Sequence, residues 1–491
     1  MALLYGFDFT DAERAFRTAS RFDPASPMPY WGIAMANGPN YNAPFPTLPE
    51  ERAASDALAQ ARLRAPEVGL SHDLIAALTL RLDCVPRPNY TALNSAYAGA
   101  MRGLAGRYPD LADVQTLFAE SLMSEHAWRL WGPAGAPGPD TREILSVLGS
   151  TLQRWPDDIG ANHLYIHAVE ASPHPELGLR SAQRMAAIGA AVGQGGGHLL
   201  HMAAHIYMRT GDYVAAEAST RAAFQSDRPL LENPVANPAY ALGYAVHNLV
   251  FLMRAAEADG DLAQAQSAAN ELARVAEGAR GEGEHGGGAL DVGALEVPVR
   301  FGLWQSILAI PARPEAVPFR AAFAHFARGC AFAGLGQLPQ ALRERAALRS
   351  FLLTPEAPRA VGIPALPARI WYELAVHSLD ARIQAARNQP AAGATQWRQA
   401  MAAADALPYA EPPAWPPVAV SLGAALLQAG DARAAEAAFR NALTRWPSDP
   451  RALFGLESAL RRQNRIAEAE TARREYLSQW RGASPPRLSV F

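Results

Sequence analysis

The stretch LGAALLQAGDARAAEAAFRNAL, residues 422–443, decides the fold because it recurs further along the chain with a fixed spacing. Its Gly430 aligns with Asn464, and its Ala435 aligns with Ala469. The offset of 34 residues is the period of the tetratricopeptide repeat, in which two antiparallel helices, A and B, form each unit. The pattern predicts a close approach of the helices at Gly423, where a small residue is needed.

Prolines extend the same repeat towards the N-terminus, because a proline ends helix B of each unit. They occur in FDP (22–24), YPD (108–110), WPD (155–157) and WPS (446–448). The sequence therefore predicts an all-α fold, a tetratricopeptide-repeat right-handed superhelix (an α-solenoid) over residues 1–491. Within it we expect N-terminal repeats at 1–110, histidine-rich central repeats at 111–275 and C-terminal repeats at 289–491.

Composition excludes several classes of protein. The 491 residues are 49% hydrophobic and 19% charged, which is typical of a folded chain. A net charge of −3 argues against a nucleic-acid partner, and no apolar run approaches the roughly 20 residues of a membrane span. No signal peptide is visible, so we expect a cytoplasmic protein. The repeat spacing places Met1 inside a first helix A, so an earlier natural start with an export signal remains an alternative.

Two segments, HLYIHAVEASPH (163–174) and HLLHMAAHIYMRTGD (198–212), hold six of the twelve histidines. Helix A of a tetratricopeptide unit faces the concave groove with its positions 2, 5, 9 and 12. The repeat spacing places histidines or carboxylates at such positions in four consecutive A helices. These residues are Glu120, then His163, His167 and Glu170, then His198, His201 and His205, and finally His247.

This register predicts a metal site. Histidines at i and i+4 share one helical face and can bind one ion together. Neighbouring helices pack about 10 Å apart, so their side chains can converge. A lone helical histidine is usually structural, but matching histidine faces on consecutive helices favour metal binding. We predict the ligands His163, His167, Glu170, His198, His201, His205 and His247, which suffice for one or two ions.

Aromatic and amide side chains flank the histidine blocks. PYWGIAMANGPNYN (29–42) contributes Trp31, Asn37 and Asn40, HAWRLWGP (126–133) contributes Trp128, and Tyr240 precedes His247. We predict that they bind a substrate. The alternative is that the asparagines cap helices and the tryptophans pack in the core.

These blocks resemble a bacterial family of tetratricopeptide-repeat proteins with the motifs AYWGIAM, GPNYN, NHLYIHxxE, GHLxHMxxHIYxRxG and HNxxFL. Here the last three read NHLYIHAVE (162–170), GHLLHMAAHIYMRTG (197–211) and HNLVFL (247–252). The chain departs from the family at Ala203 and Ala204, where members usually have proline and a small residue. The resemblance covers nearly the whole chain and implies the fold and the motif. Because most members have no known function, it implies no reaction.

The predicted function is that of a metal-dependent enzyme, an oxidase or oxygenase with a mono- or dinuclear site in the groove. Imidazole ligands suit copper, which we favour, as well as iron or zinc. The substrate would be a small molecule or a peptide, and the candidate catalytic residues are Glu170, Glu120, Tyr207 and Tyr244. A hydrolase or lyase with Glu170 or Glu120 as its base is one alternative. A protein-binding scaffold and a metal-delivery protein are others.

Overall fold

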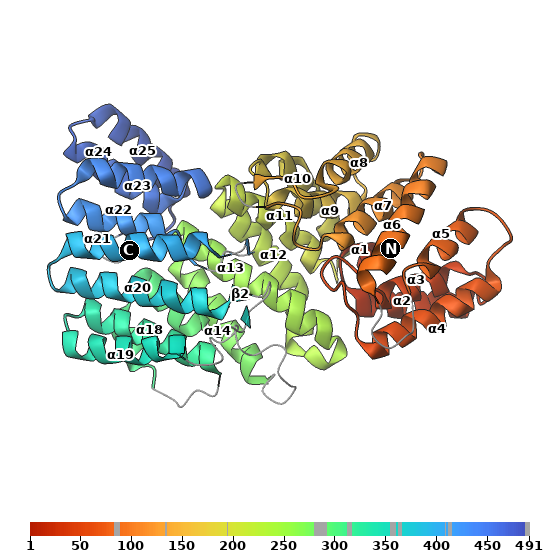
Figure 1. Ribbon diagram of the computed structural model, residues 1–491, viewed down its shortest axis with the longest axis horizontal. Helices are drawn as coiled ribbons and strands as arrows, with labels where there is room; N and C mark the ends of the chain where they lie inside the picture. The colour runs from red at the N-terminus through yellow and green to blue at the C-terminus, as the bar shows by residue number, and fades with distance from the viewer. Residues whose placement is uncertain are drawn as a thin grey trace. The chain divides into compact units, whose positions relative to one another are not determined.

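The computed structural model describes residues 1–82, 89–132, 135–193, 195–278, 292–311, 317–353, 360–361, 366–407, 409–410 and 415–486. Consecutive helices pack against one another as antiparallel hairpins (Figure 1). This arrangement confirms the predicted all-α fold of tetratricopeptide type. The glycine-rich segment 279–288 and half of the proline-rich segment 407–416, where the sequence predicts loops between repeats, lie outside the described residues.

The chain divides into two compact units, and the predicted single solenoid over residues 1–491 stays a prediction. The first comprises Met1–Ile206 and Ala222–Ala245, and the second comprises Tyr207–Arg221 and Val246–Phe491. The division into three stretches of repeats stays a prediction.

The first unit contains the following elements, in chain order: α1 (Ala2–Tyr5), α2 (Phe9–Phe22), α3 (Met28–Asn37), α4 (Leu48–Arg64), α5 (Leu70–Thr79), α6 (Tyr90–Arg107), α7 (Ala112–Glu125), α8 (Thr141–Arg154), α9 (Ile159–Glu170), the 3-10 helix η2 (Pro175–Gly178), α10 (Leu179–Val192), the 3-10 helix η3 (Pro234–Ala236) and the π-helix η4 (Tyr240–Ala245). Two further helices, α11 (Gly197–Thr210) and α12 (Tyr213–Glu232), each contribute residues to both units.

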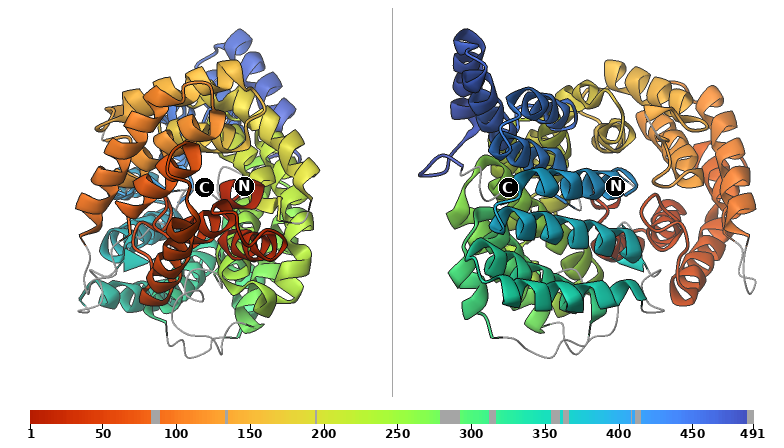
Figure 2. Two further views of the ribbon diagram at one scale, coloured as in Figure 1. Left: turned by 90° about the vertical axis from the view of Figure 1, so that its right-hand side faces the viewer. Right: turned by 60° about the vertical axis from the view of Figure 1, so that its left-hand side comes forward.

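The second unit contains α13 (Val246–Asp259), α14 (Leu262–Gly278), α16 (Gly293–Phe301), α17 (Trp304–Ala309), α18 (Pro318–Gly334), α19 (Leu338–Ser350), the 3-10 helix η6 (Phe351–Leu353), β1 (Ala360–Val361), β2 (Leu366–Pro367), α20 (Ala368–Ala386), α21 (Pro390–Asp405), α22 (Val418–Gln428), α23 (Ala432–Arg445), α24 (Pro450–Arg462) and α25 (Ile466–Gln479). The two short strands pair antiparallel. In the right-hand view of Figure 2, the helices from α18 (green) to α22 (blue) lie side by side. None of the described helices has the length and apolar character needed to cross a membrane.

Turn and capping residues explain where the helices begin and end. Gly211 and Gly430 have positive φ angles of 84° and 86°, which glycine adopts without a steric penalty. Asn464, the repeat equivalent of Gly430, has a φ of 60°, and asparagine tolerates this region best among the other residues. Asp158 caps the N-terminus of α9, where its carboxylate accepts a hydrogen bond from the backbone N–H of Ala161 (2.7 Å).

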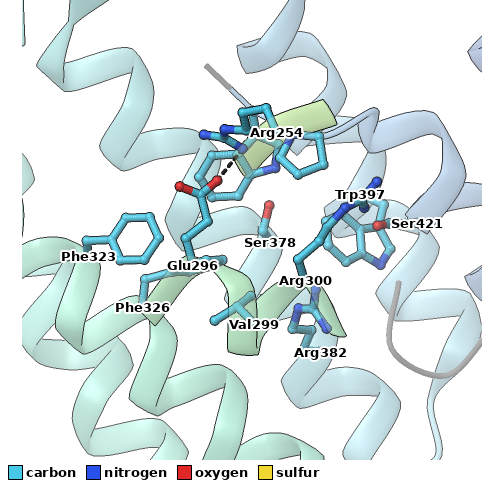
Figure 3. Close-up of a pocket in the computed structure, with 12 residues that line it drawn as sticks. Arg254, Glu296, Val299, Arg300, Phe323, Phe326, Ser378, Arg382, Trp397 and Ser421 are labelled. Carbon is cyan, nitrogen blue, oxygen red and sulfur yellow. Dashed lines mark ion pairs between the residues drawn. The ribbon is translucent and has the colours of Figure 1, made fainter. Parts of the chain in front are cut away.

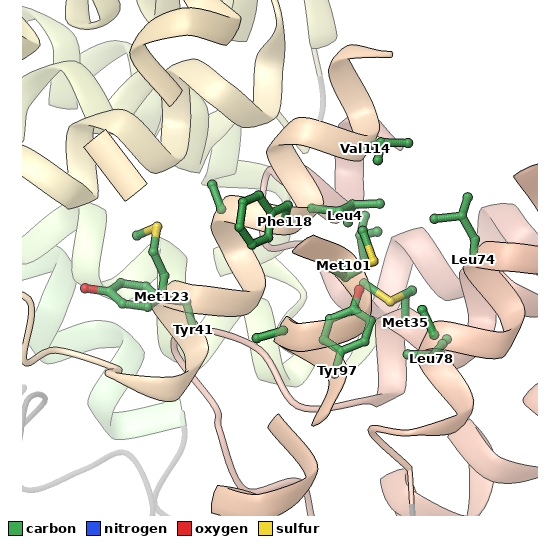
Figure 4. Close-up of a cluster of buried hydrophobic side chains, with 14 of the residues drawn as sticks. Leu4, Met35, Tyr41, Leu74, Leu78, Tyr97, Met101, Val114, Phe118 and Met123 are labelled. Carbon is green, nitrogen blue, oxygen red and sulfur yellow. The ribbon is translucent and has the colours of Figure 1, made fainter. Parts of the chain in front are cut away.

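The helix pairs of the first unit pack around an apolar core. In the first unit, Leu74 and Leu78 of α5, Met101 of α6, and Val114 and Phe118 of α7 belong to one buried cluster (Figure 4). The same cluster includes Phe7 and Tyr41, whose rings contact the histidines, so the apolar core is continuous with the histidine site.

In the second unit, Phe439 of α23 packs onto the backbones of two neighbouring A helices. A Cβ atom added to Gly423 of α22 would lie 2.6 Å from the Phe439 ring, and one added to Gly455 of α24 would lie 2.2 Å from it. The predicted close approach at Gly423 is therefore confirmed, and a single buried ring sets the spacing of consecutive repeats.

We predict that Gly423→Ala destabilises the protein by about 1–3 kcal/mol, because the new methyl group overlaps the ring of Phe439. Gly103→Ala in α6 is the matched control, since a Cβ there meets nothing within 4 Å. It should stabilise the protein by about 0.4–1 kcal/mol, because it restricts the unfolded chain. Urea denaturation followed by circular dichroism measures both changes. A Gly423→Ala variant as stable as the Gly103→Ala variant would contradict this packing.

Candidate metal centre

Helices α9 and α11 bring five histidines of the first unit together. In α9, residues three and four apart share a face, and α11 repeats that spacing. The side chains are buried, with 0–3% of each residue exposed, rather than displayed on an open groove surface. The five are His163, His167, His198, His201 and His205.

Three of these histidines form a triad that could hold a metal ion. Each of His163, His167 and His198 offers a ring nitrogen, and these three atoms lie within 4.8 Å of one another. The ring centroids of His163 lie 4.9 Å from those of His167 and 5.0 Å from those of His198. One ion with bonds of about 2.0–2.1 Å to imidazole nitrogen would need only a small closure of the three rings.

Hydrogen bonds at Nδ1 orient two members of the triad. The Nδ1–H of His163 donates to the backbone carbonyl of Tyr5, and Nδ1 of His167 lies 2.9 Å from Oε1 of Glu170. Because a carbonyl and a carboxylate only accept, Nδ1 of each ring carries the proton that is donated, and Nε2 is the nitrogen that each ring could offer to a metal ion. Both Nε2 atoms are buried and have no hydrogen-bond partner among the described residues.

The protonation states of His163 and Glu170 are compatible with the binding of a metal ion. Burial, reinforced by the neighbouring His167, holds the pKa of His163 well below its usual value, so the ring is neutral. Burial acts to raise the pKa of Glu170, but the charges of His205 and His167 and their hydrogen bonds lower it to about 2. Glu170 is therefore an ionised carboxylate at neutral pH.

Glu170 connects the two helices. Its Oε1 faces His167 on its own helix, and its Oε2 accepts a hydrogen bond from Nδ1 of His205 on α11. Nε2 of His205 lies 2.7 Å from Nε2 of His201, so one of these two nitrogens donates to the other. This placement supports a role for Glu170 in orienting imidazoles, while its predicted roles as ligand and base stay predictions.

Aromatic rings enclose the triad. The ring centroid of Phe7 lies 4.5 Å from that of His163, 5.9 Å from that of His167 and 5.6 Å from that of His198. Tyr41 and Trp128 flank the other side of His167, at 5.4 and 5.9 Å. Phe7 has a φ of 57°, an uncommon conformation for a bulky side chain that is held by this packing.

The contacts that Tyr5 and Phe7 make with the histidines could not be predicted from the sequence. Tyr5 acts through its backbone carbonyl, which any residue could supply, and Phe7 looks like an ordinary core residue. Tyr41 lies inside the motif GPNYN, and that motif is the one signal that could have identified it.

The π-helix η4 places Tyr240 and Tyr244 beside α11, and π-helical turns are frequent at functional sites. The Tyr240 hydroxyl accepts from the backbone N–H of His198 (2.9 Å) and donates to Asp227 (3.1 Å). Tyr244 lies with its ring 4.9 Å from that of His198 and accepts a hydrogen bond from Asn42 (3.2 Å). Burial raises the pKa of Tyr244 to about 12 and that of Tyr240 well above its usual value, so both phenols are neutral.

The other predicted substrate-binding residues have structural contacts. Asn37 donates to the backbone carbonyl of Ile33 (3.0 Å). Asn40 accepts from the backbone N–H groups of residues 42 and 43, which forms a local turn. Trp31 is buried in the core of the first unit, and its indole nitrogen has no hydrogen-bond partner among the described residues. A role in substrate binding stays a prediction for all three.

Among the described residues of the first unit, Glu120 contacts other partners than the triad, and two further candidates belong to the second unit. Glu120 pairs with Arg81 (3.2 Å) and accepts a hydrogen bond from Ser124 (2.7 Å). Because Arg81 is almost completely buried, this ion pair gives Glu120 a structural role. Tyr207 and His247 belong to the second unit. The catalytic and ligand roles of these residues stay predictions.

Comparisons with known proteins give distant likenesses only. No protein-family model matches the chain, and no curated protein matches it, so the resemblance to the histidine-motif family stays a prediction. Among solved structures, a human IFIT1 dimer with m7Gppp-AAAA is similar, with 11% identity over 88% of this chain and 86% of that chain and a TM-score of 0.33. Yeast Tom70 gives 11% identity over 96% and 89% and a TM-score of 0.27. Naa15/Naa10 bound to HypK-THB gives 13% identity over 96% and 68% and a TM-score of 0.24.

Proposed function

We propose that the protein is a metal-dependent oxidoreductase, an oxidase or oxygenase, that holds copper or iron between the Nε2 atoms of His163, His167 and His198. The observation that carries the proposal is the pair of buried Nε2 atoms of His163 and His167, which lack any described partner while Nδ1 of each ring is engaged. A metal-binding histidine characteristically donates its other ring N–H to a carbonyl or a carboxylate. Both kinds of acceptor are present here.

The free-energy cost of burying these two nitrogens without partners supports a bound metal ion. A buried polar atom without a hydrogen bond costs about 1–3 kcal/mol, so two such nitrogens side by side are a burden for an empty core. Coordination removes that cost. Neutral imidazoles are the preferred ligands of copper, zinc and iron, and carboxylate-rich sites suit magnesium, calcium or manganese.

The placement of Glu170 favours redox chemistry over hydrolysis. A hydrolytic metal site needs a carboxylate or another base beside the metal-bound water. Glu170 directs its oxygens at the Nδ1 atoms of His167 and His205, where it orients rings rather than a water molecule. Copper or iron, when bound, would supply one-electron chemistry. Phe7 and Tyr41 would exclude bulk water, and the neutral phenol of Tyr244 would lie beside His198. We propose a small molecule or a peptide as the substrate.

We predict that His167→Ala lowers the metal content of protein purified without a histidine tag at least tenfold, because it removes one of three ligands. His126→Ala is the matched control. His126 is a partly buried histidine of the same unit that bonds Asp140 (2.9 Å) instead of the triad. Mass spectrometry of metals measures the content, and circular dichroism checks the helices. Equal metal content in both variants would contradict the assignment.

We predict that Glu170→Gln weakens metal binding by about 10–100-fold although all three ligands remain, because an amide cannot accept from both imidazoles. Titration against a chelator of known affinity measures the change. Affinity equal to that of the wild type would show that Glu170 does not orient the triad.

We predict that copper- or iron-reconstituted protein consumes dioxygen with its substrate, and that zinc-reconstituted protein does not, because zinc has no redox chemistry. An oxygen electrode measures the uptake during a screen of candidate substrates. Turnover with zinc alone, or without oxygen, would move the assignment to a hydrolase or lyase.

A further inference from the structure

The second unit contains a pocket that the histidine site does not explain (Figure 3). Residues of α13, α16, α18, α20, α21 and α22 line it, and it encloses about 630 Å³, including the part open to solvent. The kinds of side chain that line this pocket, rather than its size, indicate which ligand it would bind.

The lining carries an excess of positive charge. It includes three arginines, Arg254, Arg300 and Arg382, and one acidic residue, Glu296. Arg254 forms an ion pair with Glu296 at the pocket wall. Arg382 lies over the rings of Trp304 and Trp397, each at 5.8 Å.

Arg300 is the cation without a counter-ion in contact. It makes no hydrogen bond or ion pair with any residue that the structure describes. The charges of Asp449 and Glu257 act on it only through space, and burial lowers the pKa of its guanidinium from the usual value. A partly buried guanidinium with unused donors is a strong site for a carboxylate, which can accept two parallel hydrogen bonds.

Two polar atoms at the pocket also lack partners. Ser378 is fully buried, and its hydroxyl has no hydrogen bond with any described residue. The Nε atom of Arg254 is likewise buried and without a partner. In Figure 3 the Ser378 hydroxyl lies between the phenylalanine side of the pocket and the side formed by Arg300 and Trp397. Native cores leave few such groups unsatisfied, so these donors could bind a polar ligand.

Aromatic rings form the walls. Phe323 and Phe326 lie on one side and Trp397 on the other, and the Trp415 ring centroid lies 5.1 Å from that of Phe326. We propose that this pocket binds a small aromatic carboxylate, whose ring lies between these side chains and whose carboxylate accepts from Arg300 and Ser378. The site is independent of the proposed metal centre.

Isothermal titration calorimetry of the full chain tests the proposal with 1-naphthoate and 1-naphthamide, which have nearly the same shape and differ in charge. We expect 1-naphthoate to bind at least tenfold more tightly than the amide. Arg300→Gln should weaken binding of 1-naphthoate by tenfold or more, and Ser378→Ala should weaken it several-fold. Arg398→Gln changes an exposed arginine next to Trp397 and should leave the affinity unchanged.

Ser378→Ala keeps the test decisive if the arginine variant folds poorly, because it removes only a hydroxyl that has no partner. Equal affinity of the wild-type protein for the acid and the amide would overturn the proposal. Affinity equal to that of the wild type in the folded variants Arg300→Gln and Ser378→Ala, or in Ser378→Ala alone when Arg300→Gln does not fold, would also overturn it.

Discussion

The hydrogen bonds at Nδ1 of His163 and His167 are the constraint on which the proposed metal centre depends. They leave each Nε2 buried and without a described hydrogen-bond partner, and they tie α9 to the Tyr5 carbonyl and to Glu170. Glu170 is a buried anion, which is costly unless it is well paired. Its contacts with His167 and His205 offset that cost and join α9 to α11. Ligand orientation and helix packing therefore rest on the same interactions.

A repeat fold makes such a site easy to build. Each helical hairpin packs mainly on its neighbours, so equivalent positions in successive A helices lie side by side. His163 and His198 are 35 positions apart in the sequence, close to one repeat period, and their rings are in contact. The two-helix spacing sets the distance between the ligands, and Phe439 with its two glycines shows how the same spacing is kept in the second unit.

The local patterns of the sequence predicted the features that depend on the repeat period or on the spacing of residues along a helix. They identified the 34-residue repeat, the close approach at Gly423 and the shared face of the α9 and α11 histidines. They did not predict the cover formed by Tyr5 and Phe7, because the Tyr5 carbonyl meets His163 from 158 residues away and carries no side-chain signal. The Glu120–Arg81 ion pair was missed for a similar reason, since nothing in either local pattern links residues 39 positions apart. The burial of the histidines depends on the contacts with Tyr5 and Phe7, which lie far from them in the sequence.

Anomalous diffraction from crystals of tag-free protein, collected at the absorption edges of copper, iron and zinc, tests the metal centre most directly. We expect a peak at the copper or iron edge about 2.0–2.2 Å from Nε2 of His163, His167 and His198. Peaks only at other residues, or triad nitrogens that are hydrogen-bonded to water with no metal beside them, would contradict it.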